Sequence, residues 1–222
     1  MKKLKIAGLL VFLLITTGSF AQISHPPFWE DIQSFKKQDS IIAPAKKQIL
    51  FVGSSSFTKW TDVQNYFPGY KIINRGFGGS SLPDVIRYAD EIIIPYRPKQ
   101  ILIYCGENDL AASDTITAQI VFNRFKKLFV LIRKTLPRVP IVFVSLKPSP
   151  SRAHLMPKMT AANTMIKNYL SKNKSTGFVD VYHKMLKPNG KPLDNIFLED
   201  KLHMNAEGYK IWLKAIKPYL KK

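Results

Sequence analysis

The residues best suited to covalent chemistry in this sequence are an early serine and a late aspartate–histidine pair. Ser55 follows the apolar run 49–52 and lies in the hydroxyl-rich segment 53–56. Asp200 and His203 stand three positions apart, just before a final amphipathic stretch. A serine hydroxyl becomes a nucleophile when a histidine accepts its proton, and an aspartate can orient that histidine. These residues therefore have the types needed for a Ser-His-Asp hydrolytic centre.

Acyl transfer also needs hydrogen-bond donors for a tetrahedral oxyanion. The segments 74–80 and 106–109 each follow a predicted strand, and both contain glycine and asparagine. The backbone N–H groups of Ser55 and Gly79 and the side-chain amide of Asn108 would supply three donors. Since Gly79 has no side chain, its N–H can approach a substrate closely. We therefore expect these separate segments to meet at one site.

The elements that would position these residues alternate between strand-like and helix-like segments. Strands are predicted at 48–52, 70–73, 100–104, 141–145 and 177–181, and helices at 28–38, 82–93, 118–135, 156–172 and from a cap at Asn205 to about 220. Such alternation predicts a parallel sheet with helices on both faces. Ligands of such sheets bind beyond the carboxyl ends of the strands, where the candidate residues fall.

Four segments, 53–56, 74–80, 106–109 and 200–203, follow one another along the chain. In this order they resemble the sequence blocks of the SGNH hydrolases, the GDSL-type esterases and lipases. The matching residues are Ser55 (nucleophile), Gly79 and Asn108 (oxyanion hole), and Asp200 and His203 (the Asp-x-x-His of the last block). The resemblance covers nearly all of residues 22–222. It implies a three-layer α/β/α sandwich with a parallel, flavodoxin-like central sheet, and a serine esterase mechanism without metal or organic cofactor.

One position departs from the family pattern. The first block usually reads Gly-Asp-Ser-Leu, and Ser54 stands here where the aspartate is expected. Three consecutive serines also leave Ser54 and Ser56 as alternatives to Ser55 for the nucleophile. We expect Ser54 to lie beside the substrate. Arg152, in the loop after the fourth predicted strand, could bind an anionic substrate group or belong to an ordinary surface loop.

Other interpretations of the same segments fit less well. A dinucleotide-binding loop at 76–81 lacks its third glycine, because Ser81 stands there. The nucleophile elbow of the α/β-hydrolases fails because Phe57 occupies its final glycine position. Asp200 and His203 have no third metal ligand at a recognisable spacing. We therefore expect neither a metal nor an organic cofactor.

Composition and charge limit the class of protein. With 222 residues and 45% hydrophobic content, the chain suits one domain with a sizeable core. Cys105 is the single cysteine and is expected to be a small buried residue. The net charge of +19 comes from scattered lysines without an interleaved aromatic and basic motif, so nucleic acid is not expected as a partner. The basic surface is either simply solvated or attracted to anionic surfaces, and no stable partner is evident.

The first residues have the pattern of a secretory signal peptide. Lysines precede the apolar run 6–17, and the segment 19–21 has the small-x-small form of a cleavage site. An uncleaved membrane anchor is the alternative, but the run is shorter than the roughly 20 residues of a membrane span. We therefore predict a signal peptide at 1–21, a hydrolase domain at 22–222, and a secreted or periplasmic protein of bacterial type.

Together these observations predict an exported serine esterase acting on a small-molecule or glycan ester. Short O-acyl groups on carbohydrates, acetyl above all, are the first expectation, because the chain is compact and has no obvious hydrophobic lid. A lysophospholipase or another lipid acylhydrolase is the enzymatic alternative, which the basic surface would suit. A carbohydrate- or surface-binding protein that kept the fold without catalysis is the third.

Overall fold

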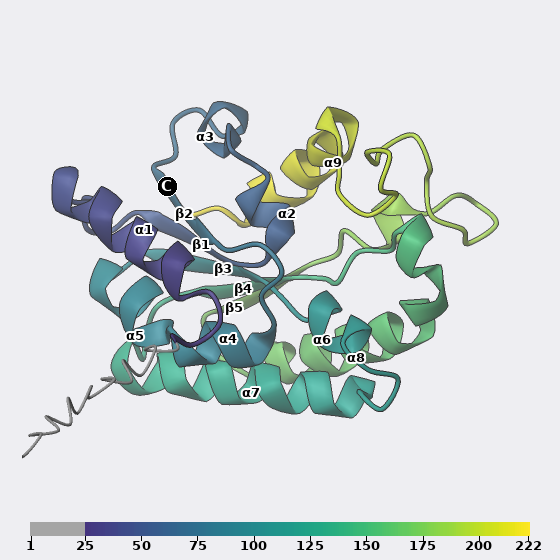
Figure 1. The fold of residues 1–222 in the computed structure, drawn as a ribbon, viewed down its shortest axis with the longest axis horizontal. Helices are drawn as coiled ribbons and strands as arrows, with labels where there is room; N and C mark the ends of the chain where they lie inside the picture. The colour runs from purple at the N-terminus through teal and green to yellow at the C-terminus, as the bar shows by residue number, and fades with distance from the viewer. Residues whose placement is uncertain (1–24) are drawn as a thin grey trace, which may run out of the picture.

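The computed structural model describes residues 25–222, so the predicted signal peptide and its cleavage site lie outside the described residues. In the described part, parallel strands form one sheet in the order β2-β1-β3-β4-β5 (Figure 1). Their bounds are β1 Ile49–Gly53, β2 Ile72–Gly76, β3 Gln100–Tyr104, β4 Ile141–Val144 and β5 Thr176–Val179. This is the flavodoxin-like strand order, so the predicted fold class is confirmed.

Helices cover both faces of this sheet (Figure 1). One face carries α1 Trp29–Ile41, α4 Leu82–Arg87, α5 Ala89–Ile92, α7 Ala118–Thr135 and α8 Met156–Ser171. The other carries α2 Ser55–Thr58, α3 Val63–Tyr66 and α9 Ala206–Ile216. The short α6, Glu107–Ala111, follows β3, and 3-10 turns lie at η1 Ile94–Tyr96, η2 Pro150–Leu155, η3 His183–Met185 and η4 Lys217–Tyr219. No helix within residues 25–222 has the length and apolar character to cross a membrane.

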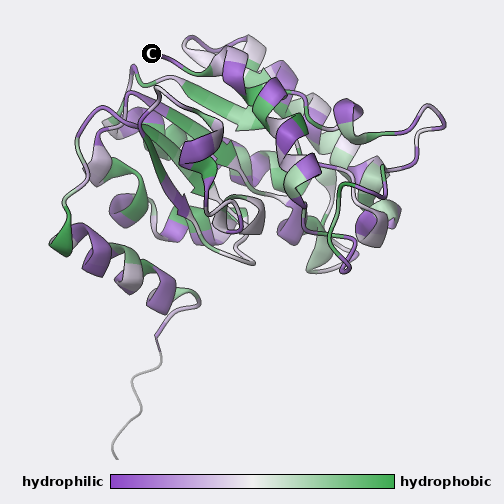
Figure 2. Ribbon diagram, turned by 90° about the horizontal axis from the view of Figure 1, so that it is seen from above, coloured by the Kyte–Doolittle hydropathy of each residue, from purple (hydrophilic) through white to green (hydrophobic). Residues whose placement is uncertain are grey.

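The strands are apolar on both faces because each face of the sheet is covered. All five residues of β1 are buried. Leu50 and Val52 belong to the hydrophobic cluster beneath α7 and α8, whereas Ile49 and Phe51 belong to the cluster beneath α9. Figure 2 shows this apolar sheet inside more hydrophilic helices. The two clusters hold the sheet rigidly, so the loops at its carboxyl edge have a fixed base.

Two local predictions were wrong. β2 pairs with β1 as far as Gly76, so Asn74 lies within the strand instead of at its end. The expected helix 82–93 is interrupted at Tyr88, whose hydroxyl donates to the Pro27 carbonyl at 2.8 Å. The predicted cap of the last helix is confirmed, because the Asn205 side chain accepts from the first backbone N–H groups of α9.

Candidate active site

The carboxyl end of β1 and the loop before α9 bring the predicted serine, histidine and aspartate together. Ser55 begins α2, directly after β1 and Ser54. His203 Nε2 lies 3.0 Å from Ser55 Oγ, and His203 Nδ1 lies 2.6 Å from Asp200 Oδ2. An ionised carboxylate can only accept, so Nδ1 carries the proton and Nε2 offers its lone pair to the hydroxyl. The imidazole is therefore oriented to accept a proton from Ser55.

The Asp200 carboxylate is held by more than the imidazole. Its Oδ1 accepts from the backbone N–H groups of Leu202 and His203, each at 2.9 Å. Desolvation would raise the pKa of Asp200, but the hydrogen bonds from the His203 ring and from these N–H groups outweigh it and hold that pKa well below its usual range. Asp200 thus remains charged opposite the histidine.

A tight turn presents these two side chains on one side of the loop. Lys201 has a left-handed φ of 54°, and its N–H donates to the Leu198 carbonyl at 2.9 Å. The Leu198 N–H in turn donates to the His203 carbonyl at 2.8 Å. The chain therefore reverses between Asp200 and His203, which is how a three-residue spacing brings both functional groups together.

The three predicted oxyanion donors differ in whether their N–H groups already donate to an acceptor within the protein. Within residues 25–222, the N–H groups of Ser55 and Gly79 donate to no protein acceptor. Gly79 has a φ of +83°, a conformation that favours glycine. Asn108 instead uses both amide hydrogens, because Nδ2 donates to Ser54 Oγ at 2.7 Å and to the Ser80 carbonyl at 3.0 Å. Asn108 must therefore release one partner before it can donate to an oxyanion.

The neighbouring serines occupy different positions from Ser55. Ser54 is only 5% exposed, and its hydroxyl lies against Asn108, so its contact with substrate stays a prediction. Ser56 is buried as well, and its carbonyl accepts from the Tyr209 hydroxyl at 3.0 Å. Ser55 is partly exposed and is the one of the three whose Oγ lies at hydrogen-bonding distance from His203. The geometry thus favours Ser55 as the nucleophile.

The loop after β4, in which Arg152 was expected to bind substrate or to lie in an ordinary surface loop, reaches the site through contacts that the sequence did not indicate. Arg152, in η2, donates from Nη2 to Asn108 Oδ1 at 2.8 Å. Lys147 is 1% exposed, and its Nζ lies 3.2 and 3.3 Å from the carboxylate oxygens of Glu107, which also accepts from the Tyr104 hydroxyl. Burial lowers the pKa of Lys147, although Glu107 opposes that shift. A lone lysine between a strand and prolines carries no sequence signal of such a pair.

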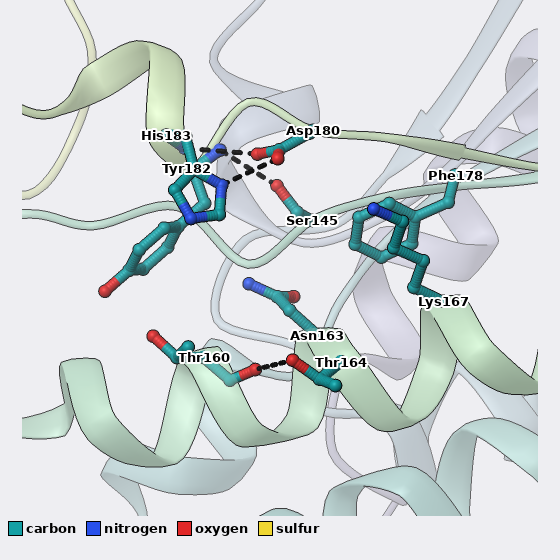
Figure 3. Close-up of a pocket in the computed structure, with 9 residues that line it drawn as sticks. All are labelled: Ser145, Thr160, Asn163, Thr164, Lys167, Phe178, Asp180, Tyr182 and His183. Atoms are coloured by element: carbon teal, nitrogen blue, oxygen red, sulfur yellow. Dashed lines mark hydrogen bonds and ion pairs between the residues drawn. The ribbon is translucent and has the colours of Figure 1, made fainter.

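A second aspartate–histidine pair lies after β5 (Figure 3). His183 Nδ1 is 2.7 Å from Asp180 Oδ2, and the His183 N–H donates to Asp180 Oδ1 at 3.1 Å. Both residues line a cavity of about 90 Å³. The nearby Ser145 hydroxyl accepts from the Val181 and Tyr182 N–H groups. This pair therefore has the local geometry of Asp200 and His203 but lacks a serine on the imidazole.

Comparison with known proteins places the chain in a family. Residues 39–211 match the GDSL-like lipase/acylhydrolase family. An acylhydrolase from Bacteroides fragilis has a TM-score of 0.74 at 23% identity, with 86% of this chain and 96% of that one covered. A GDSL-like lipase from Bacteroides thetaiotaomicron has a TM-score of 0.73 at 23% identity, with coverages of 85% and 96%.

A more distant likeness joins this chain to an acetyl-xylooligosaccharide esterase from Geobacillus. Its TM-score is 0.63 at 14% identity, with 80% of this chain and 96% of that one covered. No curated protein matches the sequence significantly. At these identities the structural likenesses establish a shared fold, while the family match covers most of the chain.

Proposed function

Because this chain belongs to the GDSL-like lipase/acylhydrolase family and is a carboxylic ester hydrolase, we propose that Ser55, His203 and Asp200 perform its ester hydrolysis. The observation that carries this proposal is the continuous hydrogen-bonded chain from Ser55 Oγ through the His203 ring to Asp200. These contacts have the geometry that nucleophilic catalysis by serine requires.

In the proposed reaction, Ser55 Oγ attacks the ester carbonyl while its proton passes to His203 Nε2. The tetrahedral intermediate collapses as the imidazolium gives that proton to the leaving alcohol, which leaves an acyl group on Ser55. A water molecule then attacks the acyl carbon, again losing its proton to His203. Return of that proton to Ser55 Oγ releases the acid. Asp200 keeps its charge throughout and stabilises the imidazolium.

The negative oxygen of the intermediate would be held by the N–H groups of Ser55 and Gly79 and by the Asn108 amide. The first two have no protein acceptor in the described part of the chain. The Asn108 N–H that donates to Ser54 Oγ would donate to the oxyanion instead. The second Asn108 N–H would keep its hydrogen bond to the Ser80 carbonyl. A neutral hydroxyl is a weaker acceptor than an oxyanion, so this exchange favours the transition state.

A fluorophosphonate probe tests the proposed nucleophile directly. We expect the probe to label the peptide that contains Ser55, as identified by mass spectrometry. Ser55→Ala should abolish labelling, while Ser56→Ala is a matched control that should keep it. Labelling of Ser54 or Ser56 would refute the assignment. Absence of any labelling in folded protein would refute a reactive serine nucleophile at this site.

For the substrate, we propose short O-acyl groups, acetyl first, on carbohydrates. The likeness to an acetyl-xylooligosaccharide esterase supports this class through the fold. A second support is Phe28, whose ring would lie 3.7 Å from a Cβ placed on Gly79, and which packs edge-on against Phe77 at 5.3 Å. We propose that this aromatic pair beside Gly79 limits the room for a long acyl chain.

A panel of p-nitrophenyl esters from acetate to palmitate, with acetylated xylo-oligosaccharides and a lysophospholipid, tests this preference. We expect the highest kcat/KM on acetyl esters. Phe28→Ala should raise the ratio of butyrate to acetate hydrolysis by roughly 10-fold or more, since butyrate has two methylenes more than acetate and one methylene in an apolar pocket already changes selectivity by about that factor. Preferential turnover of palmitate or lysophospholipid would instead support the lipid acylhydrolase alternative, for which the charge of +19 would favour anionic membranes.

We also propose that the protein is exported, from the pattern of the first residues. N-terminal sequencing of protein from the native host should begin at Gln22. Intact protein beginning at Met1 in the cytosol would refute export.

A further inference from the structure

The segment after β4 contacts both halves of the proposed active site through consecutive residues. The Ser151 N–H and hydroxyl donate to the Lys201 carbonyl at 3.1 and 3.0 Å, within the turn between Asp200 and His203. The next residue, Arg152, donates to Asn108 Oδ1 at 2.8 Å. The turn η2 therefore connects the loop that carries the base with the residue that would donate to the oxyanion.

The contact with Arg152 determines which way the Asn108 amide faces. The guanidinium has only donors, so it requires the amide oxygen. The Ser80 carbonyl has only acceptors, so it requires the amide nitrogen. A flipped amide would oppose donor to donor and acceptor to acceptor. Arg152 and Ser80 thus hold Nδ2 on the side of Ser54, where the N–H would be presented to an oxyanion.

The guanidinium also changes the amide electronically. A hydrogen bond from a cation to the amide oxygen withdraws electron density, which makes the Nδ2 hydrogens stronger donors. The hydrogen bond from Arg152 matters most during turnover, when Asn108 Nδ2 stops donating to Ser54 Oγ and donates to the oxyanion instead. An amide without a partner on its oxygen could rotate in that step and lose the transition-state contact.

We propose that Arg152 is a positioning residue of the oxyanion hole, acting through the Asn108 amide. This proposal rests on the proposed serine esterase function and extends it. It differs from the expectation that Arg152 binds an anionic substrate group, because it predicts an effect on neutral esters and on kcat. The buried Lys147–Glu107 pair supports it, because it ties the same segment to the residue directly before Asn108.

The test compares Arg152→Ala, Arg152→Lys and wild type on p-nitrophenyl acetate and on the p-nitrophenyl monoester of succinic acid, whose acyl group ends in a carboxylate. We expect Arg152→Ala to lower kcat on the neutral ester by roughly 10- to 100-fold, the range of a charge-assisted hydrogen bond, with little change in KM. Arg152→Lys keeps a cationic donor and should recover part of the loss. His154→Ala changes an exposed residue of the same turn and is the matched control, with kcat expected within two-fold of wild type.

Coupling to Asn108 separates positioning from general destabilisation. In an Asn108→Ala background, Arg152→Ala should cause little further loss, because the group it positions is absent. Melting temperatures on the same preparations identify misfolded variants. Should Arg152→Ala be unfolded at the assay temperature, Arg152→Met, which has no hydrogen-bond donor, takes its place in both comparisons.

Three outcomes would overturn the proposal: kcat of Arg152→Ala within two-fold of wild type on p-nitrophenyl acetate, a loss confined to KM for the succinate ester, or a full multiplicative loss in the Asn108→Ala background. Hydrolysis by wild type and by Ser55→Ala is measured first. If Ser55→Ala hydrolyses the ester as fast as wild type, the proposed function is refuted. If Ser55→Ala is inactive, the proposed function stands, and the Arg152 variants then decide the positioning role.

Discussion

Two Asp-x-x-His pairs in this molecule have almost the same local geometry and very different surroundings. The distance from imidazole Nδ1 to carboxylate is 2.6 Å at Asp200–His203 and 2.7 Å at Asp180–His183. In both, the histidine N–H donates to the other carboxylate oxygen, at 2.9 and 3.1 Å. The His203 side chain is 18% exposed and meets Ser55, whereas the His183 side chain is 71% exposed.

The comparison separates what a short turn supplies from what the fold supplies. Wherever the chain turns, an aspartate followed three residues later by a histidine can accept hydrogen bonds from the backbone N–H and the ring of that histidine. A nucleophile for the imidazole has to come from elsewhere in the chain. At His203 it is Ser55, the first residue of α2 just after β1, 148 positions away in sequence. At His183 no serine hydroxyl of the described residues meets the imidazole: Ser145, which lines the same cavity (Figure 3), accepts instead from the backbone N–H groups of Val181 and Tyr182.

Substitution of the two histidines should give the largest contrast. His203→Ala removes the base and should lower kcat by on the order of 10⁵- to 10⁶-fold, the loss seen when comparable hydrolases lose their serine or histidine. His183→Ala should leave kcat within about two-fold of wild type. Ester hydrolysis by both variants, with melting temperature as a control, makes the comparison. Comparable losses in the two would show that the second pair takes part in catalysis.

Substitution of the two aspartates should give the same contrast in kcat, but with a smaller loss. Asp200→Asn preserves the shape of the side chain but no longer fixes the imidazole tautomer, and should lower kcat by roughly 10⁴-fold. Asp180→Asn is its matched control and should have little effect on kcat. A loss below 10-fold in folded Asp200→Asn would mean that His203 is oriented by other groups.

The sequence predicted those parts of the site that lie within single blocks. Gly79, Asp200 and His203 lie in loops before helices, whereas Ser55 and Asn108 lie in the short helices α2 and α6, which follow β1 and β3 and which the hydrophobic pattern did not predict. The parallel sheet followed from the alternation of strands and helices. The flavodoxin-like strand order was expected from the resemblance to a family, since alternation alone leaves several orders possible.

What could not be predicted are contacts between segments distant in sequence. Arg152 and Asn108 are 44 positions apart, and their bond depends on how two loops meet above the sheet. The buried Lys147 contradicts the usual exposure of lysine, and only its pairing with Glu107 makes that burial tolerable. The interruption of the helix at Tyr88 coincides with a contact to Pro27, again a tertiary effect.

Asn108 offers a more moderate test of how the fold completes the site around His203. Asn108→Ala should lower kcat by on the order of 10²- to 10³-fold, about 2.7–4 kcal/mol, the cost of losing one oxyanion donor, with much less change in KM. The alternative is that Asn108 only ties Ser54 and Ser80 together. In that case the variant would melt at a lower temperature yet keep most of its kcat. Both quantities are therefore measured on one preparation.

The smallest expected effect concerns the stability that Asp200 contributes. Since its pKa is lower in the folded protein than the roughly 3.9 of an unfolded chain, the charged carboxylate stabilises the folded state at pH values above that unfolded pKa. This contribution is lost as pH falls toward the folded pKa, where the carboxylate becomes protonated in both states. The difference in Tm between wild type and Asp200→Asn should therefore shrink as pH falls from about 5 to 2.

The size of this effect is limited because the Asp200 side chain is 46% exposed and solvent screens its interactions. We expect a Tm difference of roughly 2–4 °C or less at pH 5, measured by thermal unfolding in buffers of equal ionic strength. The series starts at pH 5 because the carboxyl of an unfolded aspartate, with a pKa of roughly 3.9, is still largely charged there. Asp180→Asn in the same buffers corrects for removing a carboxylate from a histidine pair. A Tm difference that stays constant or grows between pH 4 and 2 would contradict the lowered pKa, and with it the view that the hydrogen bonds of the turn hold Asp200 charged beside His203.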